Sequence, residues 1–368
     1  LDALAAENPR TLLTASVGNT ASGATSPNRV LSPATGYNNI AVGALGSPAT
    51  NYDSPAFFTN GGPNDHSDPL NGRVPRVRQA VDIAAPGDQV ATAYYGGITG
   101  GNRSSLAGGP DGPAGGPDWY SRSVRGTSFS APLVAGGATL LYDAAYANFA
   151  ANDDARDARV VKAVLMNSAE KTAGWDNDQQ PHPNGNGGVL TEQGLDNFVG
   201  TGRMNLATAF DQYLAGTTDV PDGSSETANS VEEIGWDFGS VTEAVTTDYL
   251  INQELEAGSI FNATLTWFRD REQVGVTNFE DLSFDNLDLE LWMANEGLPL
   301  AIVAESRSMY NNSEHFSFSI PTQAEYMLRV RWTGEIFDEL GDENTESYGL
   351  AWMGVAVPEP TTGVLASV

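Results

Sequence analysis

Residues 126–137 read GTSFSAPLVAGG, and this stretch decides how the first half of the chain is interpreted. A glycine-led loop runs into small and apolar residues, so we predict a helix that begins near Ser128, with Pro132 in its first turn. Ser128 would then lie where unpaired backbone N–H groups and the positive end of the helix dipole meet. That position favours a nucleophilic oxygen and the oxyanion that forms when it attacks a carbonyl. On these grounds alone, a capping role is the commoner one for a serine at a helix start.

The order of residues in this stretch is more specific than its composition. GTSFSAPLVAG closely resembles the nucleophile motif of subtilisin-like serine peptidases (peptidase family S8, the subtilases), in which the serine of Gly-Thr-Ser attacks the peptide bond. The resemblance covers roughly residues 1–214, about the second half of such a catalytic domain. Further segments follow the family order: residues 14–19 (TASVGN), 32–34 (SPA), 40–44 (IAVGA), 58–63 (FTNGGP), 71–74 (NGRV), 81–87 (VDIAAPG), 161–169 (VKAVLMNSA) and 200–205 (GTGRMN).

The resemblance implies an α/β fold, a subtilisin-like parallel sheet flanked by helices whose N-terminal part is missing. It also implies a serine endopeptidase that hydrolyses peptide bonds with an Asp-His-Ser triad, requires no cofactor for the chemistry and takes polypeptide substrates. Ser128 is then the nucleophile and Asn19 donates to the oxyanion. The segments that would wall the primary substrate pocket are small or apolar and predict a preference for apolar side chains: Ser16, Val17, Gly18 and Leu31.

The triad is incomplete in this sequence. In the family, Asp-Ser/Thr-Gly and His-Gly-Thr motifs precede the oxyanion asparagine, and neither motif is present. The histidines are His66, His182 and His315, all after Asn19, and we interpret His66 as a solvated loop side chain. We therefore expect a fragment without its true start, with the triad Asp and His not in this chain and no activity alone. The alternative is a non-catalytic surface or binding protein that retains the subtilisin fold.

Composition excludes several other classes. The 368 residues include 47 acidic and 18 basic side chains, a formal net charge of -29, which repels nucleic acids and anionic membrane surfaces. The absence of cysteine excludes disulfides, thiolate zinc sites and cysteine nucleophiles. No run of 18 or more apolar residues occurs, so we predict no membrane span in these residues. We expect a monomer.

The charge and the residue pattern both divide the chain. Residues 1–219 carry 20 acidic and 13 basic groups, whereas residues 220–354 carry 26 and 5. Short apolar runs alternate with helix-like segments in the first part, and the second part is a series of alternating apolar and polar strands. We predict a partial subtilisin-like domain over 1–216, a linker over 217–230 and an antiparallel, jelly-roll-like β-sandwich over 231–355.

The last part of the chain has resemblances of its own. Residues 262–267, 285–291 and 326–330 are similar to strands of β-sandwich modules that follow some bacterial subtilisin-like domains. Residues 356–368 begin AVPEP and resemble the start of a Pro-Glu-Pro (PEP-CTERM) sorting tail, cut short here. This resemblance implies a bacterial protein that is secreted or associated with the cell envelope.

An acidic cluster in the second part suggests a metal. Asp281, Asp285, Asn286 and Asp288 offer hard oxygen ligands of the kind that calcium binds, so a structural calcium ion is one interpretation. The other is a solvated acidic face. We predict the metal ligands as Asp281, Asp285 and Asp288.

Overall fold

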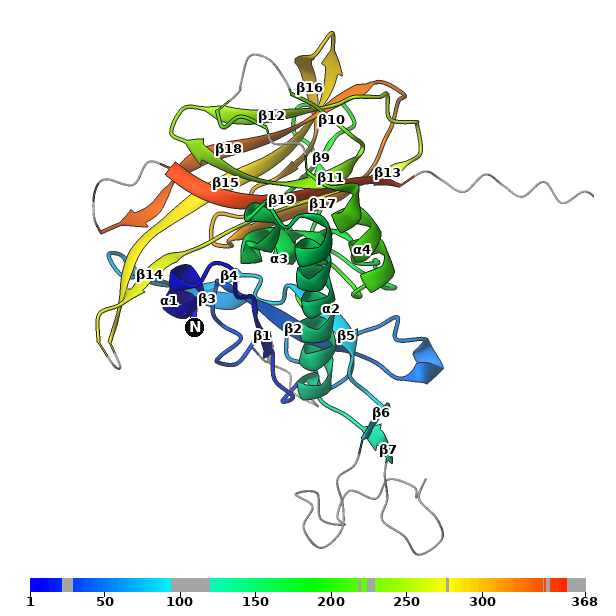
Figure 1. The fold of residues 1–368 in the computed structure, drawn as a ribbon, viewed down its shortest axis with the longest axis vertical. Coiled ribbons are helices and arrows are strands. Elements are labelled where there is room, and N and C mark those ends of the chain that lie inside the picture. Colours follow the sequence, from blue (N-terminus) through cyan, green and yellow to red (C-terminus); the bar gives the residue numbers. More distant parts are fainter. Residues whose placement is uncertain are drawn as a thin grey trace, which may run out of the picture.

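The first part of the chain is organised around a small parallel sheet (Figure 1). The computed structural model describes residues 1–21, 29–93, 120–217, 220–223, 229–275, 278–339, 341 and 345–355. Strands β1 (Leu13–Ser16), β2 (Asn39–Leu45) and β5 (Ile83–Pro86) are parallel, in the order β1-β2-β5. Every residue of β2 is buried, as expected of a parallel strand covered on both faces.

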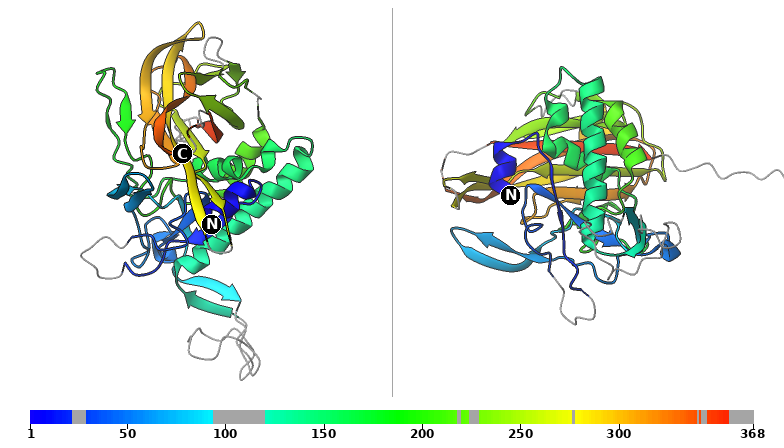
Figure 2. Two further views of the ribbon diagram at one scale, coloured as in Figure 1. Left: turned by 90° about the vertical axis from the view of Figure 1, so that its left-hand side faces the viewer. Right: turned by 60° about the horizontal axis from the view of Figure 1, so that its bottom comes forward.

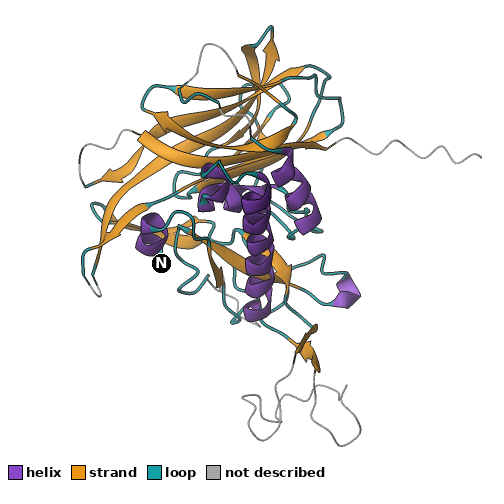
Figure 3. Ribbon diagram, in the orientation of Figure 1, coloured by secondary structure: helices purple, strands orange, loops and turns teal. Residues whose placement is uncertain are grey.

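Four helices are described: α1 (Asp2–Glu7), α2 (Thr127–Asn148), α3 (Ala158–Asn167) and α4 (Leu206–Ala215), with 3-10 turns at Pro48–Thr50 and Asp154–Arg156. The longest, α2, packs along this sheet, whereas α3 and α4 pack against the C-terminal strands (Figure 3). Two antiparallel ribbons complete this part: β3 (Asn64–Asp68) with β4 (Gly72–Arg78), and β6 (Val90–Ala93) with β7 (Tyr120–Val124). Among the helices of the described residues, none is both long and apolar enough to cross a membrane.

Two further sheets enclose the largest hydrophobic core of the described chain (Figure 2). The four-stranded antiparallel sheet has the order β11-β19-β13-β17, and the eight-stranded sheet has the order β10-β12-β18-β15-β16-β9-β8, with β14 on β15. The bounds are β8 (Gln180–Pro181), β9 (Val189–Thr191), β10 (Asn229–Val231), β11 (Ile234–Thr242), β12 (Thr246–Ile251), β13 (Ile260–Trp267), β14 (Asp270–Gln273), β15 (Phe279–Asn295), β16 (Leu298–Ser306), β17 (Ser313–Ser319), β18 (Glu325–Asp338) and β19 (Thr345–Val355).

The eight-stranded sheet takes strands from both sides of the predicted linker. β9 pairs in parallel with β16, and β8 pairs with β9, although both precede residue 217. The two parts of the chain are therefore joined through a shared sheet as well as through the segment between them. The predicted tail, 356–368, and part of the predicted linker lie outside the described residues.

Helix α3 is the element on which both parts pack. All its residues except Arg159 are buried, and Trp236 and Ala351 of the four-stranded sheet belong to the same core cluster as the helices. On the side of the parallel sheet, the Lys162 ammonium lies 3.0 Å from Asp82 Oδ1 and donates to the Asn39 carbonyl at 2.9 Å. Both side chains of this ion pair are largely buried, so each needs the other to offset its desolvation.

His66 is not a solvated loop side chain. It lies in β3, is fully buried, and its Nδ1 is 2.7 Å from the Tyr37 hydroxyl. Its ring stacks on Phe284 of β15, with ring centroids 5.8 Å apart. The polar run around His66 looked loop-like because two of the rings that cover it, Phe284 and Tyr310, come from more than 200 residues away.

Gly349 sets how closely β19 approaches α3. A Cβ atom added at Gly349 would lie 2.5 Å from the Val160 nitrogen and 2.6 Å from the Arg159 carbonyl oxygen, both rigid backbone atoms. We expect Gly349→Ala to lower the free energy of unfolding by about 1–3 kcal/mol, because the strand must move off the helix. Urea unfolding measures the change. The control Gly136→Ala adds a methyl to an open face of α2, where the substitution should be neutral or stabilising by up to about 1 kcal/mol; equal losses in both variants would contradict the packing argument.

Burial of the His66 imidazole predicts how the free energy of unfolding depends on pH. Burial, with a smaller contribution from Arg269, lowers the pKa of His66 from 6.5 to about 4. Between these values the unfolded chain binds a proton and the folded chain does not, so the free energy of unfolding falls as pH falls. At about 1.4 kcal/mol per pH unit, His66 accounts for a loss of about 3 kcal/mol over this range.

The variant His66→Gln lacks this titration, whereas all other titrating groups are common to both proteins. Urea unfolding from pH 7.5 to pH 4 should show wild type losing its stability advantage over His66→Gln by about 3 kcal/mol. A difference that stays constant with pH would show that the ring is not buried as a neutral group.

Candidate active site

Ser128 lies at the exposed start of α2. It is the second residue of the helix, after an N-terminal Gly126 with φ of 146°, and its hydroxyl makes no hydrogen bond to the described part of the chain. Pro132 is not in the first turn as the sequence suggested; it is the sixth helical residue. Since proline has no N–H, the Ser128 carbonyl receives no helical hydrogen bond from Pro132. The serine therefore stands at the open end of the helix with an unengaged hydroxyl.

Thr127 fixes the side chain of Asn19 beside this helix start. The Thr127 backbone N–H donates to Asn19 Oδ1 at 2.7 Å, and the Thr127 hydroxyl donates to the same oxygen at 3.0 Å. The Thr127 hydroxyl oxygen accepts in turn from the Gly18 N–H at 3.2 Å. Because two donors hold the amide oxygen, the Asn19 amide nitrogen must face away from them, and it has no partner among the described residues.

The end of β5 holds the same helix start from the other side. Gly126 N–H donates to the Gly87 carbonyl at 2.8 Å, and the Ser130 hydroxyl donates to the Pro86 carbonyl at 3.2 Å. A Cβ at Gly87 would lie 2.6 Å from the Ala44 Cβ, so this position requires glycine. The structure thus brings together three segments that the sequence analysis selected separately: 14–19, 81–87 and 126–137.

The predicted pocket residues lie next to Asn19. Leu31 N–H donates to the Val17 carbonyl at 3.0 Å, and a Cβ at Gly18 would lie 2.9 Å from Leu31 Cδ1. Val17 is buried, whereas Leu31 keeps 45% of its surface exposed. Ser16 is the last residue of β1, one position before this contact. Val17, Gly18 and Leu31 therefore form one apolar edge beside Asn19.

The three histidines have other partners. His66 faces Tyr37, as described above, and His182 Nε2 lies 3.0 Å from Glu305 Oε2. His315 is buried in β17 with Lys171 Nζ at 2.7 Å from Nε2 and Thr264 Oγ1 at 2.8 Å from Nδ1. Burial and the Lys171 ammonium lower the pKa of His315 well below its usual value. In the described part of the chain, no imidazole is hydrogen-bonded to Ser128.

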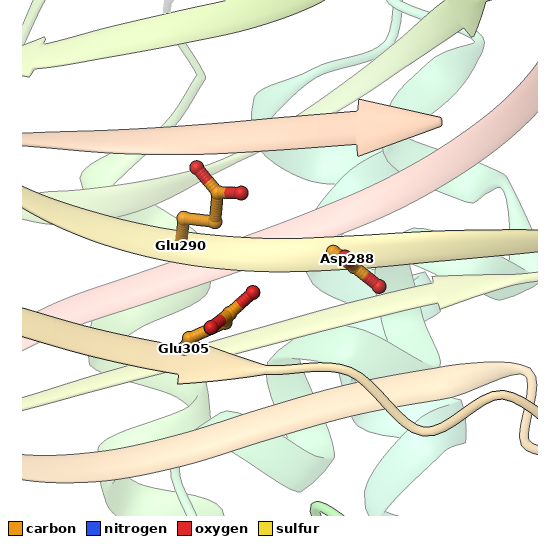
Figure 4. A group of neighbouring side chains, drawn as sticks. All are labelled: Asp288, Glu290 and Glu305. Carbon is orange, nitrogen blue, oxygen red and sulfur yellow. The ribbon is translucent and has the colours of Figure 1, made fainter. Parts of the chain in front are cut away.

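The three predicted metal ligands are not brought together. Asp281 binds Arg269 and Arg271, with Arg271 Nε at 2.7 Å, and Asp285 accepts from the Trp332 indole at 3.1 Å. Asp288 instead joins two other buried carboxylates, Glu290 and Glu305, within 4.8 Å of one another (Figure 4).

The guanidinium of Arg331 already lies among these three carboxylates. Arg331 Nη2 lies 3.0 Å from Asp288 Oδ2, 3.0 Å from Glu290 Oε1 and 3.7 Å from Glu305 Oε1. Burial raises the pKa of Asp288 to about 7, which further weakens it as a ligand at neutral pH. The carboxylates present do not fit a calcium ion unless Arg331 moves away.

Comparison with protein families agrees with the geometry around Ser128. The model of the subtilase family, Peptidase_S8, matches residues 2–202, more than half of the chain. The chain belongs to the subtilase family. Subtilases are a family of serine peptidases, whose substrates are polypeptides. No curated protein matches the chain.

Solved structures that match are similar to parts of the chain at low identity. The Aeromonas hydrophila periplasmic inhibitor of g-type lysozyme is 13% identical over 37% of this chain and 99% of its own, with a TM-score of 0.23. The Yersinia pseudotuberculosis-derived mitogen is 12% identical over 38% and 98%, with a TM-score of 0.22. The Bacillus thuringiensis delta-endotoxin Cry8Ea1 is 13% identical over 35% and 26%, with a TM-score of 0.20. At these scores the likeness carries no argument.

Thr127 belongs to the quoted motif, but only the structure shows that its hydroxyl contacts both Asn19 and Gly18. Thr127→Val keeps the shape of the side chain and leaves the Gly18 N–H without its acceptor, so we expect a loss of about 1–3 kcal/mol in the free energy of unfolding. Thr127→Ser keeps the hydroxyl and is the control. The Asn19 side-chain amide resonances should shift in the valine variant and remain close to wild type in the serine variant. Unchanged resonances in both would contradict the proposed clamp.

Proposed function

We propose that this chain carries the nucleophile and the oxyanion donors of a serine endopeptidase. The observation that carries the proposal is the clamp of Thr127 on Asn19, which leaves one amide donor free beside an exposed helix-start serine. In the proposed reaction, Ser128 Oγ attacks the carbonyl carbon of the scissile peptide. The oxyanion then accepts from Asn19 Nδ2 and from the Ser128 backbone N–H.

The remaining steps need an imidazole and a carboxylate that orients it. The imidazole takes the Ser128 proton during attack and returns it to the leaving amine, and water then hydrolyses the acyl-enzyme ester by the same route. None of the three histidines of these 368 residues is placed for this role. We infer that both groups are supplied by polypeptide other than these residues, packed beside Ser128.

Two surfaces support that inference. Among the described strands, β1 pairs only with β2, which leaves one edge of a parallel sheet open beside Asn19. Leu133 and Leu140 of α2, seven residues apart on one side of the helix, are 41% and 52% exposed, although the helix is apolar on most sides. Helices of that composition are normally buried, so this side of α2 is suited to covering by further protein.

The proposal also covers the C-terminal module, the location of the protein, its oligomeric state and its substrate preference. The sequence predicts that a β-sandwich module follows the peptidase-like part, and the Pro-Glu-Pro tail favours an exported, envelope-associated protein. Both points rest on sequence resemblance, as does the expectation of a monomer. An apolar preference at the primary pocket rests on Val17 and Leu31.

The 368-residue chain alone should not hydrolyse peptides measurably. Removing the histidine of such a triad costs about 10⁶-fold in turnover, which places the rate below ordinary detection. A quenched fluorescent casein assay on the purified chain measures this. Hydrolysis at ordinary enzyme rates that disappears in Ser128→Ala would show that the chain has its own base and would contradict the inference above.

Expressed from its complete reading frame, the protein should cleave casein in a manner that depends on Ser128 and Asn19. Ser128→Ala should abolish turnover, and Thr139→Ala, which removes an exposed hydroxyl from the same helix, should not. Asn19→Ala should lower kcat by about 10²–10³ with little change in KM, a magnitude taken from a subtilisin rather than from this chain. A fully active Asn19→Ala protein would exclude Asn19 as the oxyanion donor, and a complete but inactive protein would favour the binding-protein alternative.

A further inference from the structure

A cavity of about 870 Å³ lies where the β3–β4 ribbon and the loop after β9 meet the eight-stranded sheet. None of its lining residues belongs to the site around Ser128. Strand alternation puts Leu287 and Leu289 in the core, so Asp288 between them lies on the outer face, where the cavity is. The volume is typical of small-molecule sites.

Two aromatic rings line the cavity, one held by a hydrogen bond and the other by contact with a buried ring. The Trp332 indole N–H donates to Asp285 Oδ1 at 3.1 Å, and the Tyr310 ring lies 5.0 Å from the buried His66 ring. The Tyr310 hydroxyl has no hydrogen-bond partner among the described residues. Fixed aromatic faces beside free polar groups suit a ligand that has an apolar face and a hydroxylated edge, which is the chemistry of a sugar ring.

The polar groups of the cavity are held by the protein before any ligand binds. The Asp288 carboxylate is paired with Arg331 Nη2 at 3.0 Å, and Gln79 Nε2 donates to Gln193 Oε1 at 2.8 Å. Groups that are already ordered lose little conformational entropy on binding. Carboxylate, guanidinium and amide groups together can both donate to and accept from neighbouring hydroxyls.

Arg76 differs from the other two arginines that line the cavity. Arg331 and Arg307 each have carboxylate partners, whereas the Arg76 guanidinium has no ionic partner among the described residues. Its backbone is in the left-handed region, with φ of 59°, and the Asp65 carboxylate accepts from its N–H at 3.0 Å. Because the exposed Arg76 guanidinium lies at the cavity wall and has no carboxylate partner in the described chain, it is free to pair with a ligand carboxylate, which arginine binds through two hydrogen bonds.

We propose that this cavity binds an acidic saccharide, whose ring stacks on Trp332 or Tyr310 and whose carboxylate pairs with Arg76. An acidic peptide fits the walls less well. Extended peptides bind by adding to a free strand edge, whereas the groups that line this cavity are mainly side chains, two aromatic rings beside carboxylate, amide and guanidinium groups. The saccharide site is independent of the proposed peptidase, because it needs neither Ser128 nor Asn19.

Isothermal titration of the 368-residue chain tests this, with trigalacturonic acid as the probe. Cellotriose, a neutral trisaccharide, and triglutamate, an acidic peptide, are the comparisons. We expect saturable binding of trigalacturonic acid, at least tenfold weaker binding of the other two, and at least tenfold weaker binding of trigalacturonic acid by Arg76→Gln and by Trp332→Ala. Arg73→Gln is the matched control, since Arg73 is an exposed arginine of the same strand that does not line the cavity.

Thermal unfolding of each variant verifies that it is folded. If Trp332→Ala disturbs β18, the result for Arg76→Gln decides the test. No saturable binding up to about 10 mM trigalacturonic acid would overturn the proposal. Triglutamate binding as tightly would replace the saccharide by an acidic peptide, and cellotriose binding as tightly would remove the role of the carboxylate. Unchanged affinity in Arg76→Gln would exclude this cavity as the site.

Discussion

The structure depends on the burial of one short helix from both sides. α3 has ten residues and contributes nearly all of them to a core, between the helices and parallel sheet on one side and the four-stranded sheet on the other. Such a helix cannot exist in water without both layers, because most of its surface is apolar. The absence of a side chain at Gly349 lets β19 lie directly on its backbone, and the Lys162–Asp82 ion pair ties it to the parallel sheet.

The packing around α3 also positions the site around Ser128, because α2 belongs to the same core. The same core cluster contains residues of α2, α3, β2 and β5, so the start of α2 is positioned by packing that extends to the C-terminal sheets. Hydrogen bonds from Thr127 and Gly126 then attach that start to Asn19 and Gly87. A donor that must meet an oxyanion within a few tenths of an ångström needs this kind of support. The C-terminal sheets are in this sense part of the peptidase scaffold.

Much of the site was predictable from the sequence, because the motif segments that carry Asn19 and Ser128 keep the order expected of the family. The resemblance to subtilases assigned Ser128 and Asn19 to one site, and the structure adds Gly87, at the end of β5, as the residue that holds the start of α2. The acidic residues of β15 were not predictable in the same way. Register shifts between Phe284 and Asp285 and between Asn286 and Leu287 interrupt the alternation, so sequence spacing does not show which carboxylates meet. The partners that decide their environment, Arg331 and Glu305, come from neighbouring strands.

The central claim is that Ser128 is a nucleophile with an oxyanion donor beside it. The most direct measurement is peptide mass spectrometry of the protein, expressed from its complete reading frame and treated with a fluorophosphonate. The account predicts a single adduct on Ser128 that is lost when Asn19 is replaced by alanine or when the protein is unfolded before treatment. An unmodified Ser128, or an adduct that forms equally in the unfolded chain, would contradict it.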